Sequence, residues 1–179
     1  MSYTIAQRYA QALFDLSQER SKLTAVHHDL QEISDLANRS GDLKYFLDDP
    51  VIAREKSRVV LEEIFHGKID ALTFKFLLFL GEKNRLRHFL SICAIFNGLY
   101  EQAKGILRTK WTSSVELSTK DVDDLSGYLK KKFNKDVIAE QEVDPGSLGG
   151  IKVQIGDTVY DYTLRTQLKK FQETVRNAN

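Results

Sequence analysis

The stretch VDPGSLGGIKVQIGDTVYDYTLRTQL occupies residues 143–168 and carries one proline and three glycines in its first eight positions. A Walker phosphate loop ends in Gly-Lys-Ser/Thr, whereas Ile151 follows Gly150 here. In a dinucleotide-binding fingerprint the glycines open a helix, whereas these glycines precede another alternating segment. The pattern therefore predicts turn chemistry, in which Asp144-Pro145 begins a turn and the glycines supply positive φ between strands.

The segments around this turn alternate apolar and polar residues. Gly156-Asp157 separates two such segments, which predicts a hairpin with a two-residue turn. Upstream, residues 106–115 and the VIAEQEV segment also alternate. The residues between them have helical spacing, with Ser118 as the predicted N-cap, and a final helix is expected to begin after a cap at Thr163. The predicted order is β-α-β-β-β-α, a small α+β unit.

The chain before this unit has a different periodicity. From residue 2 to about 104, apolar residues recur every three or four positions, which is typical of amphipathic helices. Glycines and Pro50 divide this region into six helices with short connections. The fold class expected is α+β overall: an N-terminal six-helix bundle over residues 1–104, then a C-terminal α+β domain over residues 105–179.

Composition excludes several classes of protein. The chain has 179 residues with 26 basic and 25 acidic side chains, a balance that argues against a nucleic-acid binder relying on phosphate attraction. A single cysteine, Cys93, permits no internal disulfide, so a reducing compartment is expected. No signal peptide is expected at the N-terminus. The longest apolar run, residues 76–80, is too short to span a bilayer, so membrane association is expected only through partners.

Candidates for chemistry are weak. His27 and His28 are adjacent, so on a helix they point about 100° apart and are not expected to bind one metal ion. Cys93 lies on the apolar stripe of the last bundle helix and is expected to be buried and inert. No catalytic residue, cofactor or metal ligand is therefore predicted. Two alternatives stay open: a nucleic-acid-binding or regulatory adaptor using the basic cluster 83–88, and a small phosphate-ligand enzyme centred on residues 144–150.

Two helices carry more apolar surface than one buried face needs. In the helix DALTFKFLLFLGEK, Phe79 falls on the charged side, within about 60° of Lys75, Glu82 and Lys83 at 100° per residue. The first helix is apolar over more than half its circumference, through Ile5, Ala6, Tyr9, Ala10, Ala12, Leu13, Phe14 and Leu16. Such helices either lie at the centre of the bundle or also bind a partner helix in a groove. The residues alone favour central burial and leave the groove as the alternative.

Three motifs in register resemble one family. Residues 143–168 resemble the C-terminal signature of the delta subunit of F-type ATP synthases, also called the oligomycin-sensitivity-conferring protein. RYAQALFDLS at 8–17 is similar to the opening of that family, and FLGEKNRL at 79–86 to its mid-chain motif. The chain departs from the usual pattern at Gly146-Ser147-Leu148 and at Tyr162, where glycine is usual. Because tyrosine tolerates positive φ poorly, Tyr162 puts the usual turn geometry in doubt.

The resemblance implies a non-catalytic stator subunit that links the catalytic head to the membrane-anchored stalk and resists rotor torque. It implies that the bundle binds the N-terminal helix of subunit α and that the C-terminal domain binds the ends of the b subunits. It also implies a peripheral position on the cytoplasmic face of a bacterial inner membrane, with a mature organellar chain as the alternative. Neither nucleic acid nor direct membrane insertion is expected. The residues expected to line the α-binding groove are Tyr9, Ala12, Phe76 and Phe79.

Overall fold

The computed structural model of the protein describes residues 2–177 and, within them, the side chains of 4–49, 57–172 and 174. The chain divides into two compact units, Met1–Tyr100 and Glu101–Asn179. This division falls four residues before the boundary expected from the change of periodicity. The last turn of the helix that ends at Lys104 falls in the second unit, and within that turn Glu101 pairs with Arg108 at 2.6 Å.

The first unit is helical throughout. The last helix, which the apolar spacing predicts from about residue 85, begins only at Phe89, because Asn84 has a left-handed φ of 54° and a 3-10 turn follows it. The left-handed residue redirects the chain before the helix begins. The elements are α1 (Ser2–Glu19), α2 (Leu23–Arg39), α3 (Gly41–Asp48), α4 (Pro50–Phe65), α5 (Ala71–Glu82), η1 (Leu86–His88) and α6 (Phe89–Lys104).

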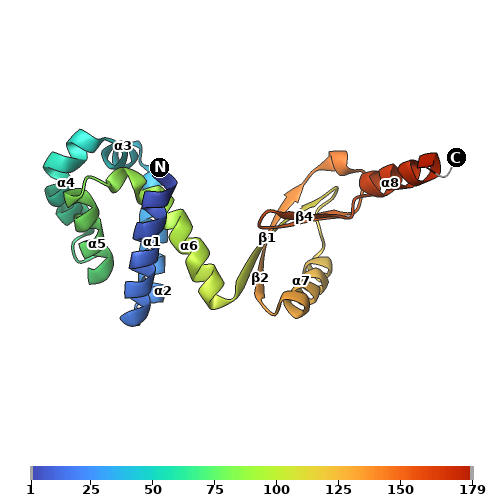
Figure 1. Cartoon of the computed structure of the whole chain (residues 1–179), viewed down its shortest axis with the longest axis horizontal. Coiled ribbons are helices and arrows are strands. Elements are labelled where there is room, and N and C mark those ends of the chain that lie inside the picture. Colours follow the sequence, from blue (N-terminus) through green and yellow to red (C-terminus); the bar gives the residue numbers. More distant parts are fainter. Residues whose placement is uncertain (1, 178–179) are drawn as a thin grey trace. The chain divides into compact units, whose positions relative to one another are not determined.

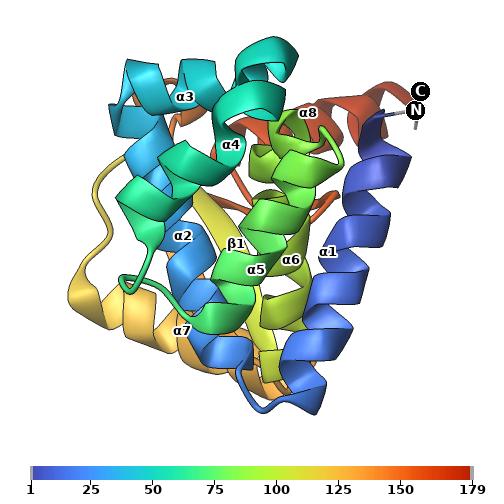
Figure 2. The ribbon, with the colours of Figure 1, turned by 90° about the vertical axis from the view of Figure 1, so that its left-hand side faces the viewer.

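One hydrophobic core holds these helices together. Ala6 and Ala10 on α1 are fully buried, and their small side chains allow the helix to approach its neighbours closely. The ring of Phe14 meets that of Phe96 edge to face at 5.9 Å, which fastens α1 to α6. Figure 2 shows α1 beside α5 and α6 in this unit. The motif at residues 8–17 therefore contributes one face of a helix to the core.

The second unit has the predicted order β-α-β-β-β-α. Its sheet has the strand order β2-β1-β3-β4, with β1 parallel to β2 and antiparallel to β3. Helix α7 makes the crossover between the two parallel strands (Figure 1). The elements are β1 (Ile106–Ser113), α7 (Thr119–Phe133), β2 (Asp136–Val143), η2 (Pro145–Ser147), β3 (Ile151–Ile155), β4 (Thr158–Asp161) and α8 (Leu164–Asn177).

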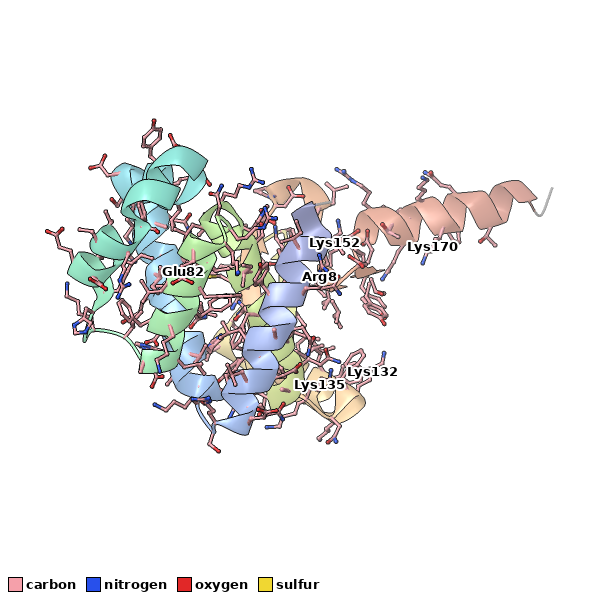
Figure 3. The ribbon with its side chains drawn as sticks, turned by 60° about the vertical axis from the view of Figure 1, so that its left-hand side comes forward. Arg8, Glu82, Lys132, Lys135, Lys152 and Lys170 are labelled. Atoms are coloured by element: carbon pink, nitrogen blue, oxygen red, sulfur yellow. The ribbon has the colours of Figure 1, made fainter. Side chains whose placement is uncertain are left out.

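The two faces of this sheet differ in chemistry. Trp111 on β1 and Val153 on β3 are paired neighbours, and both pack into a small core with Leu129 of α7. The opposite face is charged, since Arg108 donates to Glu140 at 3.0 Å. Residues alternate between these faces along each strand, as period-2 patterning predicted. At the end of α7, the Lys132 ammonium, labelled in Figure 3, lies within 5.8 Å of three ring centroids.

The glycine-rich stretch makes turns, as predicted. The Asp144 carboxylate accepts a hydrogen bond from the Gly146 amide at 2.9 Å, an Asx turn. Leu148, Gly149 and Gly150 then follow with positive φ. A Cβ on Gly150 would lie 2.4 Å from the Tyr162 carbonyl oxygen, so only glycine fits there. Tyr162 is not among the described residues with positive φ, and it needs no strained conformation.

Both predicted helix caps of the second unit are present. Ser118 accepts from the Asp121 amide, and Asp121 accepts from the Ser118 amide, which completes a capping box. Thr163 Oγ1 accepts from the Thr166 amide at 3.4 Å at the start of α8. The Thr163 amide and hydroxyl donate to Asp161, and these bonds hold the pKa of that carboxyl below its usual value.

Candidate partner-binding groove

A groove runs along the first unit between α1 and α5. Two adjoining hollows of about 310 and 400 Å³ share Tyr9, Ala12 and Phe79 as walls. All four residues predicted for the partner site line the hollow of about 310 Å³, so the fold brings them together. Prediction missed the rest of the lining: Ile5, Arg8, Leu13, Leu16, Arg20, Leu72, Lys75 and Arg85.

The groove is apolar at its base and aromatic along one wall. Phe76 is 9% exposed and forms part of the base, whereas Phe79 is 43% exposed. The Phe79 ring lies 6.0 Å from that of Tyr9, with a 58° angle between the ring planes. Ala12 is exposed, and because its side chain ends at Cβ it leaves room in the groove on the α1 side. The groove therefore offers apolar surface that the folded unit itself leaves uncovered.

The excess apolar surface of α1 consists of two faces. Ala6, Ala10 and Leu13 are buried in the core, as central burial predicted. Tyr9 and Ala12 lie on the adjoining face and line the groove. The two interpretations that the residues left open thus describe different sides of one helix. The missed lining residues of α1 follow the same spacing of three or four positions, which could have identified them.

The two helices of the groove are antiparallel. Arg20, at the end of α1, shares one hollow with Leu72, near the start of α5. Arg8, near the start of α1, shares the other with Arg85, just beyond the end of α5. The groove therefore follows both helix axes for the distance between Arg8 and Arg20, which is about 18 Å at 1.5 Å per residue.

A polar network fixes the start of α5. Asp70 is its N-cap and accepts from the Leu72 amide at 2.9 Å. Lys22 donates to Asp70 at 2.6 Å, and this bond, with that from Leu72, holds the pKa of Asp70 below its usual value. The buried Asp29 carboxylate on α2 accepts from the Asp70 amide at 2.9 Å and from Thr73 Oγ1 at 2.7 Å. These contacts anchor the α5 wall of the groove to α2.

The other end of α5 is held by close packing. A Cβ on Gly81 would lie 2.7 Å from Ser57 Oγ on α4, so glycine permits the approach of the two helices. After the left-handed Asn84, the Arg85 amide donates to the Leu80 carbonyl at 2.8 Å. This bond ends the helix in the manner of a Schellman motif. The motif at residues 79–86 therefore combines two groove residues, Phe79 and Arg85, with the residues that terminate the helix.

The two adjacent histidines do not converge. His27 Nε2 lies 2.7 Å from Asn97 Oδ1, and its ring stacks on Tyr100 at 3.7 Å. His28 instead faces Glu32 on its own helix at 3.7 Å. Within residues 2–177, no group of three His, Cys, Asp or Glu side chains is placed to hold a metal ion. His27 therefore joins α2 to α6, a structural contact that its sequence context did not reveal.

The remaining candidates for a chemical role are Cys93 and the basic cluster 83–88, and both are partly or wholly buried in the folded unit. Cys93 is buried in the core, and this burial raises the pKa of its thiol. The basic cluster 83–88 is interrupted, since Leu86 and His88 are buried. Burial also lowers the pKa of His88. The cluster is therefore not a continuous cationic face of the kind that follows a nucleic-acid backbone.

Comparison with known proteins gives consistent results. The family model described as ATP synthase delta (OSCP) subunit matches residues 5–175. The chain is 33% identical over 174 residues to ATP synthase subunit delta of Anaeromyxobacter dehalogenans, covering 97% of each chain. It is 32% identical over 178 residues to the protein of that name from Symbiobacterium thermophilum, covering 99% of this chain and 96% of the relative.

A solved structure shares the fold. A chain in the cryo-EM structure of the Toxoplasma gondii mitochondrial ATP synthase hexamer superposes with a TM-score of 0.73. The match covers 95% of this chain and 96% of that one at 20% sequence identity. The helical region and the four-stranded sheet thus recur together in a chain of distant sequence.

Proposed function

Because this chain belongs to the ATP synthase delta (OSCP) subunit family, we propose that its α1–α5 groove binds the N-terminal helix of subunit α. The chain is a non-catalytic, structural subunit of the peripheral stalk of an F-type ATP synthase. In the proposed arrangement the helical unit attaches to the catalytic head and the second unit to the stalk. The chain then resists rotor torque through two stable contacts and needs no reactive site.

The exposed Phe79 is the observation that carries the proposal for α. A phenylalanine 43% exposed beside an apolar base loses solvent contact when an amphipathic helix lies in the groove. The groove is straight because it lies between two antiparallel helices, and its length of about 18 Å matches three turns of a helix. Apolar side chains at spacings of three and four residues would contact Phe76 and Phe79 in succession.

The exposed stripe of α8 supports a second contact, with the b subunits. Leu164, Leu168 and Phe171 are 49%, 57% and 68% exposed, at a spacing of four and then three residues. Figure 1 shows α8 extending beyond the sheet of its own unit. A helical stripe of this kind suits packing against another helix. The ends of the b subunits are helices in this proposal, and they cover the stripe.

The subunit belongs to a membrane-associated complex. Among the helices of residues 2–177, none is both long and apolar enough to cross a membrane. We place the chain on the cytoplasmic face of a bacterial inner membrane, held there through its partners.

Two charge insertions test the two contacts separately. Purified chain is mixed with subunit α and with the soluble part of subunit b from its own synthase, and retention on each is measured. Ala12→Asp places an unpaired carboxylate in the groove and is expected to lose α while keeping b. Leu168→Asp is expected to lose b while keeping α. Tyr45→Asp, at a residue 63% exposed on α3, is the control and is expected to keep both.

Retention of both partners by both variants would contradict the assignment of these surfaces. Loss of the expected partner together with an altered thermal melt would mean that the substitution unfolds its unit rather than blocks a contact. Circular dichroism of each variant distinguishes these cases.

A further inference from the structure

The groove has a charged border of one sign. Arg20 and Lys75 line one end, and Arg8 and Arg85 line the other. No carboxylate lines either hollow among the residues whose side chains are described. Glu82, labelled with Arg8 in Figure 3, lies on α5 but outside this lining. The border is thus cationic in a chain whose formal net charge is only +1.

Three of the border cations lack a charge partner among the side chains that the structure describes. Among the described side chains, Arg8, Arg20 and Lys75 form no hydrogen bond or ion pair, and all three are exposed. Elsewhere on the unit, Lys22 and Arg58 do pair with carboxylates. Arg39, Lys44 and Lys68 outside the groove also form no ion pair among the described side chains, so the border cations are distinguished by their position beside uncovered apolar surface.

The spacing of the border is set by α1. Arg8 and Arg20 are twelve residues apart on one helix, which separates the two cationic ends by about 18 Å. Between them the lining is apolar and aromatic rather than charged. A nucleic-acid strand carries a charge every few ångströms and would leave most of its phosphates over apolar surface. A helix with an apolar stripe and carboxylates toward its two ends fits both features.

We propose that this groove selects an acidic amphipathic helix, whose carboxylates lie about twelve residues apart and meet the cationic pairs at its two ends. The inference rests on the proposed function, because it specifies the chemistry of the helix that the groove binds. The apolar stripe supplies most of the affinity, and the border supplies selection, since like charges on a wrong helix would face these cations. The same cations attract an acidic helix before contact and raise its association rate.

Three of the four border cations, Arg8, Arg20 and Lys75, are exposed, so the ion pairs that they form with a partner helix are weak. Exposed ion pairs contribute about 1.4- to 5-fold each in affinity, and salt screens them. Two acidic positions on the partner are thus expected to change affinity by about fivefold in total at low salt. Replacing them by lysine turns attraction into repulsion and doubles the effect in free-energy terms, to roughly 25-fold.

Synthetic peptides test this selection. Three peptides share one leucine stripe and carry Glu, Gln or Lys at two positions twelve residues apart. A fourth is the N-terminal peptide of subunit α from the same synthase. Binding to the full chain is measured by titration at about 20 mM and about 500 mM salt, where the Debye length falls from about 20 Å to under 5 Å. The Glu peptide is expected to bind tightest and the Lys peptide weakest, with the order compressed to within about twofold at high salt.

A charge-matched pair of variants localises the effect. Arg8→Gln, Arg20→Gln and Lys75→Gln together are expected to remove the preference for Glu over Lys. The control triple variant, Arg39→Gln, Lys44→Gln and Lys68→Gln, removes the same charge from exposed positions outside the groove and is expected to keep it. Arg85 is left in place because it is half-buried next to the buried His88.

The outcomes separate this inference from the proposed function. If the α peptide binds but Glu, Gln and Lys peptides bind equally, the charge selection is wrong and the α contact stands. If the Glu peptide is preferred but the α peptide does not bind, the groove selects acidic helices and the partner is another protein. Binding of none of the peptides overturns both. Tighter binding of single-stranded DNA than of the Glu peptide, lost in the border variant, overturns the choice of a helix.

Discussion

Replacing Phe79 by alanine should weaken partner binding far more than it weakens folding. A phenylalanine side chain offers about 200 Å² of surface, and Phe79 is 43% exposed, so about 90 Å² remains to be buried by a partner. At about 25 cal/mol per Å², this area corresponds to about 2 kcal/mol. The expected loss of affinity for the α-subunit N-terminal peptide is therefore about thirtyfold.

The folding cost of the same change should be smaller than that of a core truncation. Phe79 already contacts Tyr9, so Phe79→Ala is expected to lower the free energy of unfolding by about 1–2 kcal/mol. Phe89 is fully buried, and Phe89→Ala is expected to cost about 3–5 kcal/mol. Tyr45→Ala removes an aromatic that is exposed on α3, away from the groove, and should leave peptide affinity unchanged.

Isothermal titration gives the affinities, and urea unfolding gives the stabilities. Wild-type affinity in Phe79→Ala would refute the role of Phe79 as an anchor. A stability loss equal to that of Phe89→Ala would instead place Phe79 in the core and restore central burial as the reason for the apolar surface of α5.

Two further predictions concern folding. Gly150→Ala should unfold or strongly destabilise the second unit, because its Cβ would lie 2.4 Å from the Tyr162 carbonyl oxygen at a φ of +82°. Gly127 lies in the middle of α7 with open space around it, so Gly127→Ala should instead stabilise the second unit by about 0.5–1 kcal/mol in thermal melts. The folded pKa of Asp70 is lowered chiefly by its bond from Lys22, so its contribution to stability is present above about pH 4 and is lost as the pH falls through the folded pKa. Asp70→Asn keeps a cap acceptor but loses this charge, so its urea midpoint should fall less than wild type between about pH 7 and pH 3; an equal fall in both proteins would assign the acid sensitivity to other carboxylates.

Local patterns predicted the elements and their ends. The helix cap at Ser118 and the turn at Gly156-Asp157 could both be predicted from the sequence, because each depends on residues that are at most three positions apart. The 3-10 turn before α6 could not be predicted in this way, since the left-handed conformation of Asn84 follows from where α5 must end. The reason why Gly150 must be glycine was also hidden, because the atom it would strike belongs to Tyr162.

The candidate groove was predicted only in part. Tyr9, Ala12, Phe76 and Phe79 came from the resemblance together with the surplus apolar surface, and they do line one groove. The cationic border was not predicted as a unit: the sequence placed Lys75 beside Phe79 and Arg85 in the basic cluster 83–88, but Arg8 and Arg20 lie far from both along the chain.

The sequence by itself determined which residues form helices and strands and that α1 and α5 carry excess apolar surface, because periodicity reports the direction of each side chain about its own axis. Periodicity does not report which neighbour covers a given face. Only the tertiary structure decided that one side of α1 enters the core while Tyr9 and Ala12 line an open groove. It did so by docking α5 antiparallel to α1, where Asp29 holds its first turn from a distance of 41 residues along the chain. That docking, a long-range contact, is the physical reason that aromatic surface and cations from separate segments meet in one place.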